Sequence, residues 1–172
     1  LLAGVIALSR FGLESSIFYL FAYGVATVGT FGIVSLIRDS SGEVGDLNRW
    51  SGLGKRSPLL ASTFAFFLLA FAGIPLTSGF IGKFSIFSAA YESGNTSILI
   101  AGVLSSAVAA FFYIRVIVLM FFTEPPVDGP SVIVPSPFTT VAIGICAAFT
   151  LLLGIVPQPV LELVINAGLF LR

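Results

Sequence analysis

The sequence predicts an all-α integral membrane protein. Hydrophobic residues make up 57% of its 172 positions and charged residues 9%, and the mean hydropathy is +1.10. Soluble domains carry roughly 25% charged residues, so this composition excludes a soluble fold. Four apolar stretches are long enough to cross a bilayer, whose hydrocarbon core of about 30 Å needs about 20 helical residues. We therefore expect about four full transmembrane helices, one of them discontinuous.

The elements begin with two apolar segments. Residues 1–9 are apolar and start without Met, so we expect them to be the end of an earlier span and the chain to be a fragment of one membrane domain. Residues 16–37 contain no charge and lie between Glu14 and Arg38, which predicts an uninterrupted span. Residues 58–91 are too long for one straight helix, since about 34 residues would extend roughly 51 Å. We expect this stretch to be broken at residues 73–79.

Two further spans, 98–122 and 138–156, are separated by a loop that contains Pro125, Pro126 and Pro130. Proline cannot continue a helix, because it lacks the backbone donor and clashes with the preceding turn. The last segment, 159–171, is too short to cross the bilayer and contains polar residues. We expect it to lie at the membrane interface or to pack on a neighbour.

The loops predict the orientation. Loop 38–57 contains four basic residues, Arg38, Arg49, Lys55 and Arg56, whereas loop 92–97 contains none. Basic residues favour the cytoplasmic side in short loops, so we expect loop 38–57 to be cytoplasmic, with Trp50 as an interfacial anchor. Counting spans from there predicts that Arg10, Glu92 and the C-terminal Arg172 lie on the outer side.

The composition also excludes several functions. Eight basic and eight acidic residues cancel, so the chain offers no concentrated positive surface for nucleic acid. With one cysteine, Cys146, and no histidine, there is no Cys/His cluster for zinc or iron–sulfur ligation. There is also no base to activate a serine or cysteine nucleophile. We expect no cofactor and no metal in this chain.

The middle of the 58–91 stretch combines helix breakers with hydroxyl side chains. Pro75 removes a backbone donor, while Gly73 and Gly79 permit the dihedral angles of an unwound segment. The freed carbonyl groups then need partners such as Thr77, Ser78, neighbouring helices or water. Discontinuous helices of this kind build ion sites near the midplane of transporters.

Lys83 lies about 12 Å inside the outer end of the same stretch, close to the bilayer centre. Insertion of a lysine at this depth costs about 2.5 to 3.5 kcal/mol, which favours a hydrated interior over lipid. Its charge state can then follow its neighbours, as a proton relay requires. The alternatives are a lysine that extends outward past Phe84, Phe87 and Tyr91, or a purely structural ion pair. Arg115, about 10 Å from the inner end of its helix, is a candidate supporting residue.

Small side chains mark the 98–122 span, where they allow two helix backbones to approach closely. They are Gly102, Ser105, Ser106, Ala109 and Ala110. We interpret this set as a packing surface.

Residues 73–84 resemble the broken-helix signature of the antiporter-like membrane subunits of respiratory NADH:quinone oxidoreductase (complex I), with the greatest likeness to the subunit N branch. Segments 18–24, 50–58 and 111–116 agree with the same family. The resemblance implies a fold of fourteen spans with two inverted repeats, of which this chain would be the closing third.

The same resemblance implies a site and partners. Lys83 matches the lysine on the family's second broken helix, which passes protons toward the outer side, and its glutamate, lysine and histidine partners would precede Leu1. The expected partners are the other membrane-arm subunits, the lipid bilayer, protons and water, in a bacterial plasma membrane. NADH, FMN, iron–sulfur clusters and quinone would be bound by other subunits. A sodium/proton antiporter subunit and a passive membrane scaffold are the alternatives.

Overall fold

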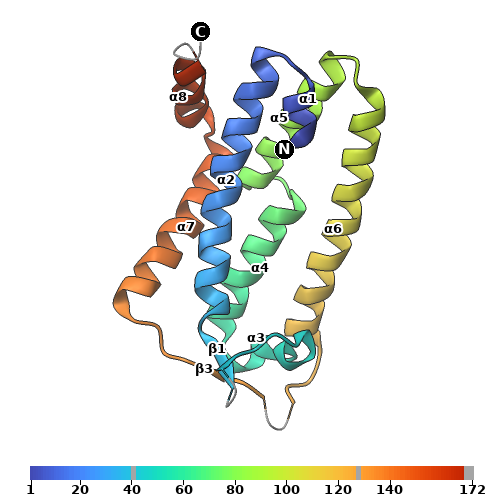
Figure 1. Ribbon diagram of the computed structural model, residues 1–172. Helices are drawn as coiled ribbons and strands as arrows, with labels where there is room; N and C mark the ends of the chain where they lie inside the picture. The colour runs from blue at the N-terminus through green and yellow to red at the C-terminus, as the bar shows by residue number, and fades with distance from the viewer. Residues whose placement is uncertain (40–41, 127–128, 169–172) are drawn as a thin grey trace.

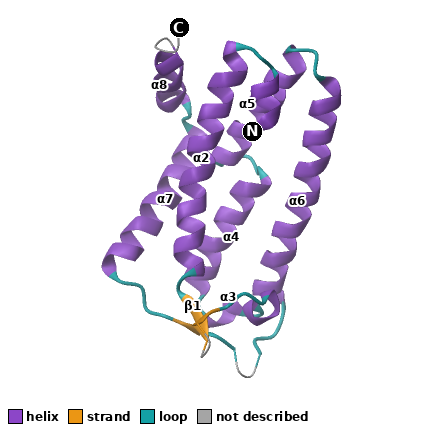
Figure 2. Cartoon of the chain, viewed as in Figure 1, coloured by secondary structure: helices purple, strands orange, loops and turns teal. Residues whose placement is uncertain are grey.

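The computed structural model describes residues 1–39, 42–126 and 129–168. Three of its helices are long and apolar enough to cross a membrane: α2 (Arg10–Val34), α6 (Thr96–Phe122) and α7 (Pro137–Ile155). The remaining predicted span is divided between α4 (Pro58–Ala72) and α5 (Ser78–Glu92), and α1 is short (Leu2–Ile6). Figures 1 and 2 show α2 and α6 running between the two ends of the molecule, while α4 and α5 each cover part of that length. The integral membrane all-α fold is thus confirmed.

The starts of α2 and α7 follow from helix capping. Ser9 precedes α2 and its hydroxyl accepts a hydrogen bond from the Gly12 amide at 3.0 Å, and Ser136 caps Thr139 in the same way at 3.2 Å. α2 begins six residues before the predicted residue 16, because the charged residues Arg10 and Glu14 form an ion pair at 2.8 Å within its first turns. A criterion based on apolar residues alone excludes such a polar first turn.

The segment predicted as a polar loop contains regular structure. Strands β1 (Ile37–Asp39), β2 (Gly42–Glu43) and β3 (Ser131–Val132) form an antiparallel sheet in the order β2-β1-β3. Strand β2 is followed along the chain by a 3-10 helix, η1 (Leu47–Trp50), and by α3 (Leu53–Arg56). Strands of two or three residues are too short to produce a periodic pattern, so the sequence did not predict them.

The prediction that Trp50 is an interfacial anchor is wrong. Its side chain is 5% exposed, its ring stacks on Phe64 with centroids 5.1 Å apart, and its indole N–H donates to the Val44 carbonyl at 3.3 Å. A buried tryptophan needs a partner for its N–H, and the loop supplies one. Trp50 therefore belongs to the core and is not an interfacial anchor.

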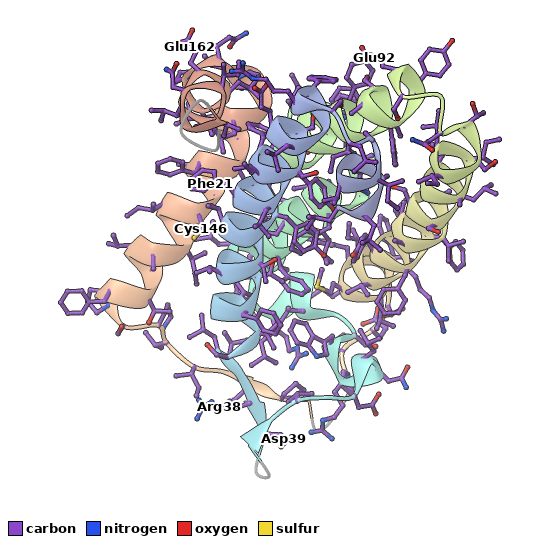
Figure 3. All side chains as sticks on the ribbon, turned by 45° about the horizontal axis from the view of Figure 1, so that its top comes forward. Phe21, Arg38, Asp39, Glu92, Cys146 and Glu162 are labelled. Atoms are coloured by element: carbon purple, nitrogen blue, oxygen red, sulfur yellow. The ribbon has the colours of Figure 1, made fainter. Side chains whose placement is uncertain are left out.

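The two ends of the bundle carry different secondary-structure elements. Arg38 and Asp39 lie at the end that carries the sheet, which we call the loop end, and Glu92 and Glu162 lie at the opposite end (Figure 3). That opposite end also carries α8 (Gln158–Gly168), so we call it the α8 end. Val164 of α8 is buried, and Arg10 donates to the Ile165 carbonyl at 3.4 Å. Arg172 and the end of the predicted 159–171 helix lie outside the described residues.

The core lies between the break and the loop end. Phe67 of α4, Ile33 of α2 and Met120 of α6 are among its fully buried side chains. Lipid tails are as apolar as these side chains, so close packing rather than removal from water holds such helices together. This packing fixes α4 against α2 and α6, and thereby positions the carbonyl end of α4.

Candidate functional site at the helix break

α4 and α5 are separated by a short non-helical segment. Gly73 ends α4 with a φ of +84°, and the amides of Gly73 and Ile74 both donate to the Leu69 carbonyl at 3.1 Å, the pattern of a glycine-terminated helix. Leu76 also has a positive φ, +70°. Thr77 is extended and its hydroxyl donates to the Ile74 carbonyl at 2.7 Å. The chain therefore leaves the helix at Gly73 and re-enters it at Ser78.

The two half-helices lie beside each other where they meet. A Cβ atom placed on Gly79, in the first turn of α5, would lie 1.9 Å from the Ala70 carbonyl oxygen in the last turn of α4. Only glycine fits this contact, because the neighbouring atom belongs to the backbone and cannot move aside like a side chain. The segment that contains Pro75 thus displaces α5 sideways relative to α4.

Lys83 connects α5 to this displaced end of α4. Its ammonium donates to the carbonyls of Phe71 and Ala72 at 2.7 and 3.1 Å and to the Ser106 hydroxyl at 2.7 Å. These three bonds use all three donors of the ammonium group. The last carbonyls of a helix lack partners within the helix and carry partial negative charge, so they suit a cation. The break supplies the acceptors, and all three are neutral oxygens.

Lys83 is partly buried, whereas the sequence analysis described a buried lysine. Among the described residues no charged side chain is fully buried. The reason is a groove of about 610 Å³ that Lys83 lines together with residues of α1, α2, α5 and α6. Lys83 is thus hydrogen-bonded to the protein through its ammonium and also lines the groove.

The groove is long and its two halves differ. Its lining on α6 runs from Ile98 to Tyr113, about 22 Å along the helix, with Ser106 near the middle. Toward the α8 end the walls are apolar, as at Leu2, Phe87 and Ile98. Toward the loop end they carry the phenol groups of Tyr23 and Tyr113.

The tyrosines pack as one cluster. The rings of Tyr19 and Tyr23 stack with centroids 5.5 Å apart, and Phe71 lies 4.8 Å from Tyr23 and 5.8 Å from Tyr113. The polar half of the groove therefore begins beside the residue whose carbonyl accepts from Lys83.

The structure brings some of the predicted site residues together and separates others. Gly73 contacts Lys83, because a Cβ on Gly73 would lie 3.0 Å from the Lys83 Cδ atom. Thr77 and Ser78 are buried at the start of α5, and among described residues the Ser78 hydroxyl has no hydrogen-bond partner. Arg115 is exposed and lies nine residues beyond Ser106, about 13.5 Å along α6. Arg115 is not part of this site.

Ser106 is the residue that the sequence analysis missed. It belongs to the set interpreted as a packing surface, and Gly102 of that set does pack closely on Phe87. A serine among small residues carries no local signal that distinguishes a ligand from a spacer. Ser106 binds Lys83 because the packing of α5 against α6 places the two residues at the same level, and this packing cannot be seen in the local sequence.

The chain is similar in sequence to known membrane proteins. The family described as "NADH:quinone oxidoreductase/Mrp antiporter, TM" matches residues 1–127. The chain belongs to this family. Over all 172 residues it is 60% identical to NADH-quinone oxidoreductase subunit N 3 of Streptomyces griseus and 56% identical to subunit N of Rhodococcus opacus. It spans 31% and 32% of the lengths of these two relatives.

Solved structures of the family share the fold. A chain of respiratory complex I from Thermus thermophilus with bound aureothin aligns with a TM-score of 0.79 and 28% identity, covering 93% of this chain and 36% of that one. A chain of the Mrp complex from Dietzia sp. aligns with a TM-score of 0.83 over 96% of this chain and 39% of that one, at 23% identity. The second match shows the fold alone.

The described residues contain no group of three or more His, Cys, Asp or Glu side chains that could hold a metal ion. The chemistry that this site can perform is the gain and loss of a proton at Lys83.

Proposed function

We propose that this chain is part of a proton-translocating membrane-arm subunit of an NADH:quinone oxidoreductase, in which Lys83 relays protons at the helix break. The observation that carries the proposal is the position of the Lys83 ammonium, between the carbonyl end of α4 and an open groove. The names of the relatives at 60% and 56% identity support the assignment to this enzyme. The chain spans about a third of their length, so the activity belongs to the whole complex.

The geometry suggests how a change of shape could move a proton. The bonds from Lys83 to the Phe71 and Ala72 carbonyls are charge-assisted, so they stabilise the ammonium form while α4 and α5 stay close together. A change of angle at residues 73–77 lengthens these bonds and removes that stabilisation. The amine form is then favoured, and the proton passes to water or to a neighbouring group in the groove.

We also propose an orientation and a set of partners. The loop end carries Arg38, Arg49, Lys55 and Arg56 and would face the cytoplasm of a bacterium, with the α8 end on the outer side of the plasma membrane. The partners would be the other membrane-arm subunits. NADH, FMN, iron–sulfur clusters and quinone would be bound elsewhere in the complex.

The test is Lys83→Ala in the full-length subunit of the assembled complex. We expect proton translocation per quinone reduced to fall strongly, because the variant removes the titratable group and leaves the groove open. Proton uptake into inverted membrane vesicles and quinone reduction are measured together, with Lys55→Ala at the loop end as the matched control.

Three results would contradict the proposal. Unchanged translocation in Lys83→Ala excludes Lys83 as a relay. Loss of complex assembly without a translocation defect in the assembled fraction favours a scaffold function. Translocation that continues when quinone reduction is inhibited favours the sodium/proton antiporter alternative; the family description names an Mrp antiporter beside the oxidoreductase.

A further inference from the structure

A second groove opens at the loop end, between α4, α7 and strand β3, with a volume of about 550 Å³. Its lining runs from Ser57 to Thr63 on α4 and from Thr140 to Ala147 on α7, which is about 10 Å of helix. That length is about a third of a hydrocarbon core of roughly 30 Å. The groove therefore extends from the polar end of the bundle into the depth of one leaflet.

The walls of this groove are mainly apolar. The hydroxyls of Thr63 and Thr140 donate to carbonyls of their own helical segments, of Leu59 at 2.9 Å and Ser136 at 3.2 Å, so they offer no unused donor. A Cβ atom on Gly144 would meet no other atom within 4 Å, which leaves open space along α7. Such a surface suits an acyl chain better than a polar ligand.

The mouth of the groove carries a positively charged side chain, Arg56. Arg56 lines the groove and donates to the carbonyls of Pro130 at 2.6 Å, Arg49 at 3.2 Å and Ser51 at 3.3 Å, all of them neutral groups. No carboxylate of the described residues forms an ion pair with Arg56. Burial and the neighbouring Arg49 guanidinium lower the pKa of Arg56, as expected for uncompensated positive charge.

Two basic side chains near Arg56 have acidic partners. Lys55, one residue earlier, pairs with Glu124 at 2.6 Å, and Arg49 pairs with Asp39 at 3.4 Å. A phospholipid phosphate would supply the missing negative charge at the depth where headgroups lie.

We propose that this groove binds an anionic phospholipid of the leaflet at the loop end, with the first part of one acyl chain between α4 and α7 and the phosphate beside Arg56. The apolar walls and the open space at Gly144 fit the chain, and the charge at the mouth selects an anionic headgroup. The site is independent of Lys83 and of the proposed proton transfer.

The test uses the complete complex in lipid nanodiscs. A phosphatidylglycerol that carries a photoreactive diazirine on its acyl chain is activated, and the crosslinked peptides are mapped by mass spectrometry. We expect crosslinks to residues 140–147 and 57–63 in the native protein. Gly144→Phe fills the groove and should abolish these crosslinks. Gly24→Phe is the control and should leave them unchanged, because a Cβ on Gly24 also meets no other atom within 4 Å but Gly24 does not line the groove.

The headgroup is tested by comparison with phosphatidylcholine that bears the same chain. We expect Arg56→Gln to reduce the preference for phosphatidylglycerol about fivefold, the contribution of one basic residue near a membrane surface. Lys55→Gln is the matched control, since it removes the same charge from the same short helix outside the groove.

Three outcomes overturn the proposal. Crosslinks that persist in Gly144→Phe show that the acyl chain does not occupy the groove. Equal crosslinking of the two lipids, or equal effects of Arg56→Gln and Lys55→Gln, shows that Arg56 does not select the headgroup. If the native complex gives no crosslinks at these residues, another segment or subunit covers the groove.

Discussion

α6 and the α4/α5 pair face each other across the Lys83 groove, and only α6 is continuous. α6 runs for 27 residues and contributes one acceptor to Lys83, the Ser106 side chain. The broken pair contributes two backbone carbonyls, those of Phe71 and Ala72. A continuous helix uses its carbonyls internally, as a membrane requires, so it can offer only side chains. Breaking a helix is therefore a way to present backbone oxygens to a cation inside the bilayer.

The largest expected effect comes from forcing the two half-helices apart. Gly79→Ala places a methyl group 1.9 Å from the Ala70 carbonyl oxygen, so the backbone must shift. We expect a loss of about 3 kcal/mol, at the upper end of overpacking costs. Thermal unfolding and yield of the assembled complex measure it. Gly24→Ala, where the methyl group meets no other atom within 4 Å, should be neutral or slightly stabilising. Equal melting temperatures for the two variants contradict the side-by-side packing.

A smaller effect is expected where the chain leaves α4. Gly73→Ala costs about 1 to 2 kcal/mol because its φ is +84°, and its methyl group also crowds the Lys83 Cδ atom at 3.0 Å. We expect a clear loss of proton translocation in assembled complexes. Gly94→Ala is the control, because Gly94 has a φ of +75° and a Cβ there meets no other atom within 4 Å. If both variants translocate protons equally well, the contact between residue 73 and Lys83 does not affect translocation.

Removing the acceptor on α6 tests the other side of the comparison. Ser106→Ala deletes one hydrogen bond to the ammonium, worth about 1.5 kcal/mol, and leaves both backbone carbonyls in place. Translocation should fall, but less than in Lys83→Ala. Ser105→Ala alters the same groove one residue away and serves as the control. A Ser106→Ala defect as large as that of Lys83→Ala would mean that the side chain, and not the broken backbone, is the principal partner.

The smallest effect is expected at the proline. The amides of Gly73 and Ile74 already end α4 by donating to the Leu69 carbonyl, so Pro75→Ala should keep the break. We expect stability to fall by about 0.5 kcal/mol, because the unfolded chain gains conformational entropy without the proline. A cryo-EM structure of the variant complex gives the end of α4 directly. A helix that continues from residue 72 through residue 78 would show that Pro75, and not Gly73, causes the interruption.

The sequence analysis recovered the features that depend on local chemistry. Apolar length gave the spans, and the glycines around Pro75 indicated where the backbone leaves the helix. It did not recover features that depend on how elements meet. Ser106 binds Lys83 only because α5 and α6 pack at a particular relative depth, and Trp50 is buried only because its loop folds back onto α4. Arg115 was included because of its charge, although it lies on a different part of α6.

At the loop end, strand pairing, an ion pair and a hydrogen bond connect the segments that adjoin α2, α4, α6 and α7. Strand β1 pairs with β3, Lys55 pairs with Glu124, and the Gly52 amide donates to the Leu119 carbonyl at 3.2 Å. Among the described residues, α5 and α6 are joined at the α8 end by the short turn at residues 93–95, without an ion pair or strand pairing between them. If α4 and α5 bend relative to each other at residues 73–77, we expect the half of the bundle nearest that turn to move more than the half joined by the sheet.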